Sequence, residues 1–145
     1  MENVNIELIC LEILSQHTKP YFLCILYRPP SSSKHLCRNY IDTFDKTLSK
    51  IKDISENKEI IITGDINCNY LNNDHEKAFK NLLSLNGFIQ TIKQPTRTTS
   101  HSETLIDVLL STRPELLSHN EVIPCTISDH DAICCTRKIN KEKQP

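Results

Sequence analysis

A chain of 145 residues is long enough for one domain, which would bury roughly two thirds of the surface that the unfolded chain exposes. Its 17 basic and 18 acidic residues give a net charge of -1, which excludes a general polyanion-binding field, so any nucleic-acid contact requires a local basic patch. No apolar run approaches the roughly 18 residues of a membrane span, and the first residues lack a signal-peptide pattern. We therefore expect a protein of the nucleus or cytoplasm that is neither secreted nor membrane-bound.

The first part of the chain predicts two strands, a helix and a third strand. Residues 5–14 and 21–27 are separated by a short turn and favour an antiparallel hairpin, and the nearly continuous apolar character of 21–27 predicts burial on both faces. Helical spacing of apolar residues then predicts a helix with Lys and Asp on its other face. The β-branched run 60–62 predicts a buried strand. The apolar positions of the helix are Ile41, Phe44, Leu48, Ile51 and Ile54.

A second helix and several short strands are predicted after residue 70. Asn73 or Asp74 is a candidate N-cap for a helix that runs to about Asn86, and Gly87 stands where a left-handed C-cap is needed. Because helices lie between strands, the fold class is predicted to be layered mixed α/β (α+β), with residues 1–138 as the domain and 139–145 as a disordered tail. The apolar side of the helix would comprise Ala78, Phe79, Leu82, Leu83 and Leu85. Further strands are predicted at 88–91, 104–111, 121–127 and 132–139.

Seven cysteines are many for this length, yet none of them has the spacing of a zinc knuckle. Several lie inside apolar strand-like runs, so we interpret them as small buried hydrophobic residues in a reducing compartment. Cys68, beside Asn67, is the one candidate for a reactive thiol.

Polar side chains follow the buried run at residues 60–62. After Gly64 come Asp65 and Asn67, a carboxylate and an amide two positions apart. If the chain stays extended there, both side chains project to the same side of the strand end. Such a pair suits a metal, an activated water or a phosphate, while the alternative is an ordinary Asp/Asn turn.

Asp107 is an acid within the apolar run 105–110. A buried carboxylate needs a partner, and His130 is the natural candidate, because an Asp–His pair fixes the imidazole tautomer and stabilises its charged form. The alternative is a carboxylate at a strand edge that faces solvent.

Four motifs bring these residues into one pattern: Tyr-Arg-Pro-Pro, Gly-Asp-Ile-Asn, Gln-Pro-Thr-Arg with a following Thr-Leu-Ile-Asp, and Ser-Asp-His. In this order they resemble the endonuclease/exonuclease/phosphatase superfamily, and their wording is most similar to the endonuclease domain of non-LTR, jockey-like retrotransposons. The resemblance extends over about residues 4 to 138. The four motifs begin at Tyr27, Gly64, Gln94 and Ser128, and the Thr-Leu-Ile-Asp that follows the third begins at Thr104.

The resemblance implies a four-layer α/β sandwich, present here in part, and hydrolysis of DNA phosphodiester bonds with Mg²⁺ or Mn²⁺. It assigns catalytic roles to Asp65, which would position or deprotonate the attacking water, and to Asn67 and Tyr27, which would contact the scissile phosphate and support its charge. His130 would be the acid or stabiliser on the phosphate side, held by Asp107.

The resemblance also implies metal and DNA contacts. Asp129 would ligate or neighbour the metal, aided by Asp65. Thr96 or Thr98 would contact phosphate. Arg97 and Arg28 would contact the DNA backbone, although each is equally compatible with an ordinary solvated cation.

Members of this superfamily carry a further upstream segment with the main metal-ligating Glu, and the sequence resembles only the C-terminal portion of such a domain. We therefore expect a truncated and impaired nuclease whose uncovered sheet edge or face favours association. One alternative is a non-catalytic nucleic-acid- or protein-binding remnant of a mobile element. Another is a phosphatase or lipid phosphodiesterase on the same scaffold.

Overall fold

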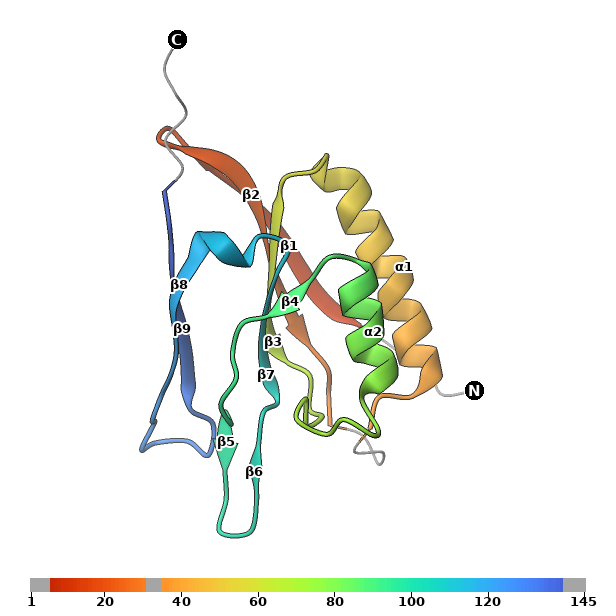
Figure 1. Ribbon diagram of the computed structural model, residues 1–145, viewed down its shortest axis with the longest axis vertical. Helices are drawn as coiled ribbons and strands as arrows, with labels where there is room; N and C mark the ends of the chain where they lie inside the picture. The colour runs from red at the N-terminus through yellow and green to blue at the C-terminus, as the bar shows by residue number, and fades with distance from the viewer. Residues whose placement is uncertain (1–5, 31–34, 140–145) are drawn as a thin grey trace.

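The computed structural model describes residues 6–30 and 35–139 and confirms a mixed α/β fold (Figure 1). The tail predicted at 139–145 lies outside the described residues except for Ile139. The strands are β1 (Glu7–Ser15), β2 (Thr18–Tyr27), β3 (Glu59–Asp65), β4 (Ile89–Gln90), β5 (Arg97–Thr98), β6 (Glu103–Thr104), β7 (Asp107–Ser111), β8 (Leu117–Ile123) and β9 (Ala132–Arg137). The helices are α1 (Arg38–Ser55), α2 (Lys77–Leu85) and the 3₁₀ turn η1 (Pro114–Leu116).

A five-stranded sheet of order β1-β2-β3-β7-β4 is the centre of the molecule. The β1–β2 hairpin is antiparallel, as predicted, and β2 runs parallel to β3, with α1 as the crossover between them. Antiparallel β7 then pairs with β3 and β4. Two small hairpins, β5–β6 and β8–β9, complete the strands.

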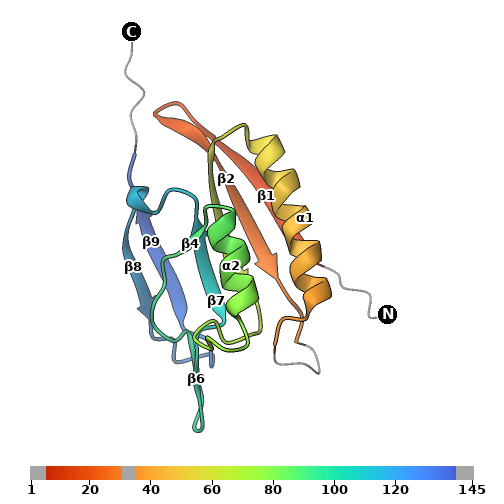
Figure 2. The ribbon, with the colours of Figure 1, turned by 45° about the vertical axis from the view of Figure 1, so that its right-hand side comes forward.

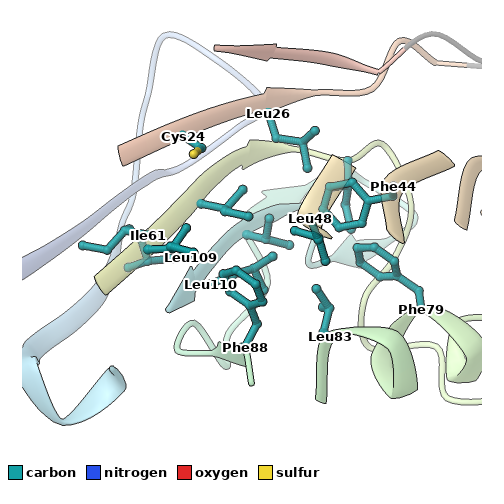
Figure 3. Packing of buried hydrophobic residues seen from close by; sticks show 14 of the residues in the cluster. Cys24, Leu26, Phe44, Leu48, Ile61, Phe79, Leu83, Phe88, Leu109 and Leu110 are labelled. Atoms are coloured by element: carbon teal, nitrogen blue, oxygen red, sulfur yellow. The ribbon is translucent and has the colours of Figure 1, made fainter. Parts of the chain in front are cut away.

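The central sheet lies between a helical layer and a β layer (Figures 1 and 2). Both helices cover one face, where Phe44 and Phe79 meet at a ring-centroid distance of 5.5 Å, surrounded by Leu48 and Leu83 (Figure 3). The β8–β9 hairpin lies toward the opposite face and contributes Leu117 to the core. The predicted fold class, a layered mixed α/β sandwich, is thus confirmed.

The residues that the helices bury differ from those predicted. In α1, Tyr40 is buried whereas Ile54 is 66% exposed, and in α2 only Phe79 and Leu83 are fully buried. The prediction that Asn73 or Asp74 caps α2 is wrong, because the helix begins at Lys77 after Glu76. Gly87 has a φ of +78° and follows the helix end as predicted.

The prediction that residues 21–27 are buried on both faces is wrong. Register places Ile9, Ile25, Thr63 and Leu109 in one row across the face opposite the helices. Along this row the exposed fraction falls from 63% at Ile9 and 49% at Ile25 to 5% at Leu109. The β8–β9 hairpin therefore shields the β7 side but leaves β1 and β2 open, and association through this face stays a prediction.

Gly64 lets β2 and β3 approach closely at the end of β3. Its φ is +145°, and a Cβ atom at this position would lie 1.7 Å from the carbonyl oxygen of Leu26. No side chain fits there, so the Gly of the Gly-Asp-Ile-Asn motif is required by packing before any chemistry is considered.

The cysteines differ from one another more than predicted. Cys10 and Cys24 form a disulfide across the β1–β2 pair, and Cys37 and Cys134 are exposed. Cys68 is buried, and this burial, followed by the charge of Glu76, raises the pKa of its thiol far above the ordinary value. Because a thiolate is the reactive form, Cys68 is better described as an inert core residue.

Candidate active site

Strand pairing brings three of the predicted residues together where β2 and β3 end and β7 begins. Tyr27 pairs with Asp65 in the parallel β2–β3 ladder, and Asp65 pairs with Asp107 in the antiparallel β3–β7 ladder. Residues that are directly opposite one another project to the same face of a sheet. The three side chains therefore form a row on the face opposite the helices, and Tyr27 is 42% exposed there.

His130 completes this group from the loop between β8 and β9. Its Nδ1 atom lies 3.1 Å from Oδ2 and 3.4 Å from Oδ1 of Asp107. The Asp107 side chain is 17% exposed and the His130 side chain 34%. The predicted Asp107–His130 contact is present, and Asp107 is not a solvated strand-edge acid.

Asp65, Asp107 and His130 could hold a metal ion, because one ligand atom from each lies within 4.8 Å of the others. Two carboxylate oxygens and an imidazole nitrogen are suitable ligands for Mn²⁺, and the oxygens also suit Mg²⁺. Burial raises the pKa of Asp65, and the neighbouring Asp107 carboxylate raises it further, while the Asn67 amide opposes the shift. A cation between the carboxylates would relieve this repulsion, so the donor set fits a divalent metal.

Sequence reasoning gave Asp107 the role of orienting His130 and did not consider it as a metal ligand beside Asp65. The signal for this second role was available, because both acids stand at the end of an apolar strand. What the sequence does not provide is the antiparallel register that makes the two residues direct neighbours.

Asn67 lies beside Asp65 but not in the predicted extended conformation. Its φ is +45°, so the chain turns directly after β3. The Asn67 backbone N–H donates to Asp65 Oδ1 at 2.7 Å, and its side-chain amide donates to the carbonyl of Arg28 at 2.8 Å. The prediction that strand alternation places Asp65 and Asn67 on the same side is therefore wrong. A turn, and not an extended strand, brings Asn67 beside the Asp65 carboxylate.

Asp129 pairs with Arg97. Arg97 Nε donates to Asp129 Oδ2 at 2.6 Å, and this guanidinium holds the pKa of the carboxyl below its usual range. Asp129 is not part of the three-residue metal group, although it precedes His130 directly. Its predicted role as a metal ligand would require Arg97 to release it.

Two of the residues predicted to contact DNA are buried. Arg28 is 6% exposed and donates to the carbonyls of Ile66 and Asn67 at 3.2 and 3.0 Å. Thr96 is 0% exposed. Direct DNA contact by either side chain is therefore corrected to a structural role, because neither is accessible to a ligand. Arg97 and Thr98 remain at the surface.

Comparisons with known proteins identify the family and the fold. The model of the family described as endonuclease-reverse transcriptase matches residues 21–134. Among curated proteins, none matches the chain.

Three solved structures share the fold. The first is the endonuclease domain of TRAS1, a telomere-specific non-LTR retrotransposon, with a TM-score of 0.71, 14% identity and coverage of 96% of this chain and 69% of that one. The second is an endonuclease/exonuclease/phosphatase family protein from Leptotrichia buccalis C-1013-b, with a TM-score of 0.60, 15% identity and coverage of 91% and 54%. The third is the Xenopus laevis APE2 catalytic domain, with a TM-score of 0.55, 18% identity and coverage of 93% and 57%.

The chain thus spans about two thirds of the first of these structures and just over half of the other two. Because the family model matches more than half of the chain, the protein belongs to the endonuclease-reverse transcriptase family of the endonuclease/exonuclease/phosphatase superfamily. In the described part of the chain, no helix is both long and apolar enough to cross a membrane.

Proposed function

We propose that this protein hydrolyses phosphodiester bonds in DNA with a divalent metal, Mg²⁺ or Mn²⁺, as the endonuclease of a retrotransposon. One observation carries the proposal: Asp65, Asp107 and His130 come from three separate segments and place their ligand atoms within 4.8 Å of one another. When bound, a divalent metal lowers the pKa of a water molecule and offsets the negative charge that develops on the phosphate.

Asp65 is the residue that positions and deprotonates the attacking water. Its raised pKa, caused first by burial and then by Asp107, brings its proton affinity closer to that of a base which works near neutral pH. The bond from the Asn67 backbone N–H to Oδ1 fixes the carboxylate and leaves Oδ2 for the metal and the water that it would hold.

His130 acts on the phosphate through its second ring nitrogen. Its Nδ1 atom is engaged by Asp107, which fixes the tautomer and orientation of the imidazole and leaves Nε2 for a phosphate oxygen. In this proposal the two carboxylates would hold the metal, and His130 lies beside it without ligating it. Tyr27, beside Asp65 and half-exposed, presents its hydroxyl to the same phosphate. Asn67 keeps one amide hydrogen for that phosphate, because the other donates to the Arg28 carbonyl.

Arg97 and Thr98 are the DNA contacts in this proposal, since both are accessible on β5. A phosphate close to Arg97 would compete with Asp129 for the guanidinium. Asp129 would then become available as a further metal ligand beside His130.

Turnover by the lone chain is expected to be low. Mg²⁺ requires about six oxygen ligands, and the three-residue group supplies only two carboxylates, so most of the coordination shell must come from water and substrate. Weak metal binding follows, and activity should require millimolar metal concentrations.

Nicking of supercoiled plasmid in Mg²⁺ or Mn²⁺ tests the proposal with Asp65→Asn and His130→Gln. We expect each substitution to lower the rate by about 10² to 10³-fold, because each removes a group that acts on the reacting atoms. Asp53→Asn in α1 and His17→Gln in the β1–β2 turn are matched controls, since both residues lie away from the site.

The outcomes separate the alternative functions. Nicking that survives both site substitutions would overturn the proposed roles. Binding of DNA by a folded chain without any metal-dependent nicking would identify a non-catalytic remnant. Turnover of phosphomonoesters or phosphoinositides without nicking would identify a phosphatase or lipid phosphodiesterase.

A further inference from the structure

Asp107 and His130 belong to segments that no strand pairing joins directly. Asp107 begins β7 in the central sheet, whereas His130 lies in the loop between β8 and β9, which form a separate sheet. A side-chain contact of 3.1 Å between such segments requires that something fix one backbone relative to the other. In space, the short segment Thr96–Thr98 lies between these two segments and contacts both.

Thr96 is bonded to the Asp107 side through its hydroxyl. The Oγ1 atom accepts hydrogen bonds from the backbone N–H groups of Ile106 at 3.2 Å and Asp107 at 3.0 Å. Ile106 precedes β7 and belongs to no ladder pair, whereas Asp107 begins β7 and pairs with Asp65. A buried N–H without an acceptor is unfavourable, so this hydroxyl fixes where β7 starts.

The same residue is bonded to the His130 side through its backbone. The Thr96 carbonyl accepts from the Asp131 N–H at 2.7 Å, Arg97 forms an isolated antiparallel bridge with His130, and the Thr98 N–H donates to the Asp129 carbonyl at 3.4 Å. Thr96 is also 0% exposed, which protects the bonds that it makes itself from water.

We propose that Thr96 is a positioning residue that sets the distance between Asp107 and His130 by holding both backbones at once. Resting on the proposed function, this assigns the threonine of the Gln-Pro-Thr-Arg motif to alignment of the Asp–His pair rather than to contact with phosphate. Serine keeps the hydroxyl acceptor, whereas valine has nearly the same shape and cannot accept.

Thr96→Val is the informative variant, with Thr96→Ser as the rescue. Thr112→Val is the matched control, because the Thr112 hydroxyl likewise accepts a backbone N–H, that of Ile60 at 2.9 Å, but at the opposite end of β7. Both valine variants should lose similar stability in urea. Only Thr96→Val should lower kcat for nicking, by about 10 to 100-fold with KM unchanged, because small displacements of reacting groups have effects of this size.

A second measurement does not depend on activity. Long-range ¹H–¹⁵N NMR spectra of the His130 imidazole report its tautomer and the hydrogen bond at Nδ1. That signature should persist in the wild type, Thr96→Ser and Thr112→Val and be lost in Thr96→Val. If the wild type proves inactive, the proposed function fails, while this spectrum still decides whether Thr96 positions the pair.

Two results would overturn the inference. One is a Thr96→Val protein that keeps both kcat within about 3-fold and the His130 signature. The other is hydrogen exchange in the wild type in which the amides of Ile106, Asp107 and Asp131 exchange independently of one another. If Thr96 holds both segments, these three amides should become exposed to solvent together. The exchange experiment needs no variant, so it also decides the matter if Thr96→Val does not fold.

Discussion

The two ends of β3 each carry an acid on the same face of the sheet, and their surroundings are opposite. Glu59, at the start, is 4% exposed, and Oε2 accepts from Arg137 Nη2 at 2.8 Å and Nε at 3.0 Å. Asp65, at the end, faces a second carboxylate, Asp107, across the ladder. The Glu59–Arg137 ion pair connects the central sheet to the β8–β9 hairpin. The Asp65 carboxylate faces a like charge, which favours binding of a cation and is typical of a functional site.

The largest expected effect comes from Gly64, which lets the Asp65 end of β3 pack against β2. Gly64→Ala would place its Cβ against the Leu26 carbonyl and force φ away from +145°, so we expect a loss of more than about 4 kcal/mol of unfolding free energy and loss of the native fold. Gly87→Ala is the matched control, because its φ of +78° is unfavourable but the space is open, and about 1 to 2 kcal/mol is expected. Urea denaturation followed by circular dichroism compares them, and equal losses would contradict the packing argument.

The Glu59 end should respond next most strongly. Arg137→Met leaves the buried Glu59 carboxylate uncompensated, and we expect a loss of about 3 to 5 kcal/mol at pH 7. The double variant Glu59→Leu, Arg137→Met should recover most of the stability, because it removes the buried charge together with its partner.

Arg38→Met serves as the control, because Arg38 forms only a surface pair with Asp42 at 3.9 Å and should change stability by less than about 0.5 kcal/mol. A comparable effect of both arginine substitutions in urea titrations would show that Arg137 does not act through Glu59.

The two ends also differ in how far the sequence predicted them. The Asp65 end was predictable because two residue types there are unusual in their local sequence. Gly64 follows a β-branched run, and Asp107 lies among apolar neighbours. Glu59 and Arg137 are ordinary charges 78 positions apart, and nothing local connects them. The family resemblance assigned a phosphate contact to Thr96 or Thr98, whereas the Thr96 hydroxyl accepts from backbone amides that only the tertiary fold brings near.

The open face of the sheet illustrates the same limit. The apolar run 21–27 indicates that β2 favours burial. The hydrophobicity of one strand does not predict which other layers of the fold cover it. Ile25 is 49% exposed because the β8–β9 hairpin covers the β7 part of that face and leaves β2 open.

The smallest expected effect has the opposite sign and belongs to Asp65. Its pKa is raised by burial and by Asp107, so the folded chain binds this proton more tightly than the unfolded chain does. Stability from this group is then complete below the unfolded pKa and falls as the pH rises through the folded pKa.

Asp65→Asn removes the ionisation while its side-chain oxygen can still accept the Asn67 N–H. We expect a gain in unfolding free energy at pH 7 and no gain at acidic pH, where the wild-type carboxyl is protonated, in exchange for lost nicking activity. Asp53→Asn on the exposed side of α1 should show neither change. Thermal unfolding from pH 3 to 8 measures both, and a destabilised Asp65→Asn protein at pH 7 would show that the Asp65 carboxylate is satisfied in the fold as Glu59 is.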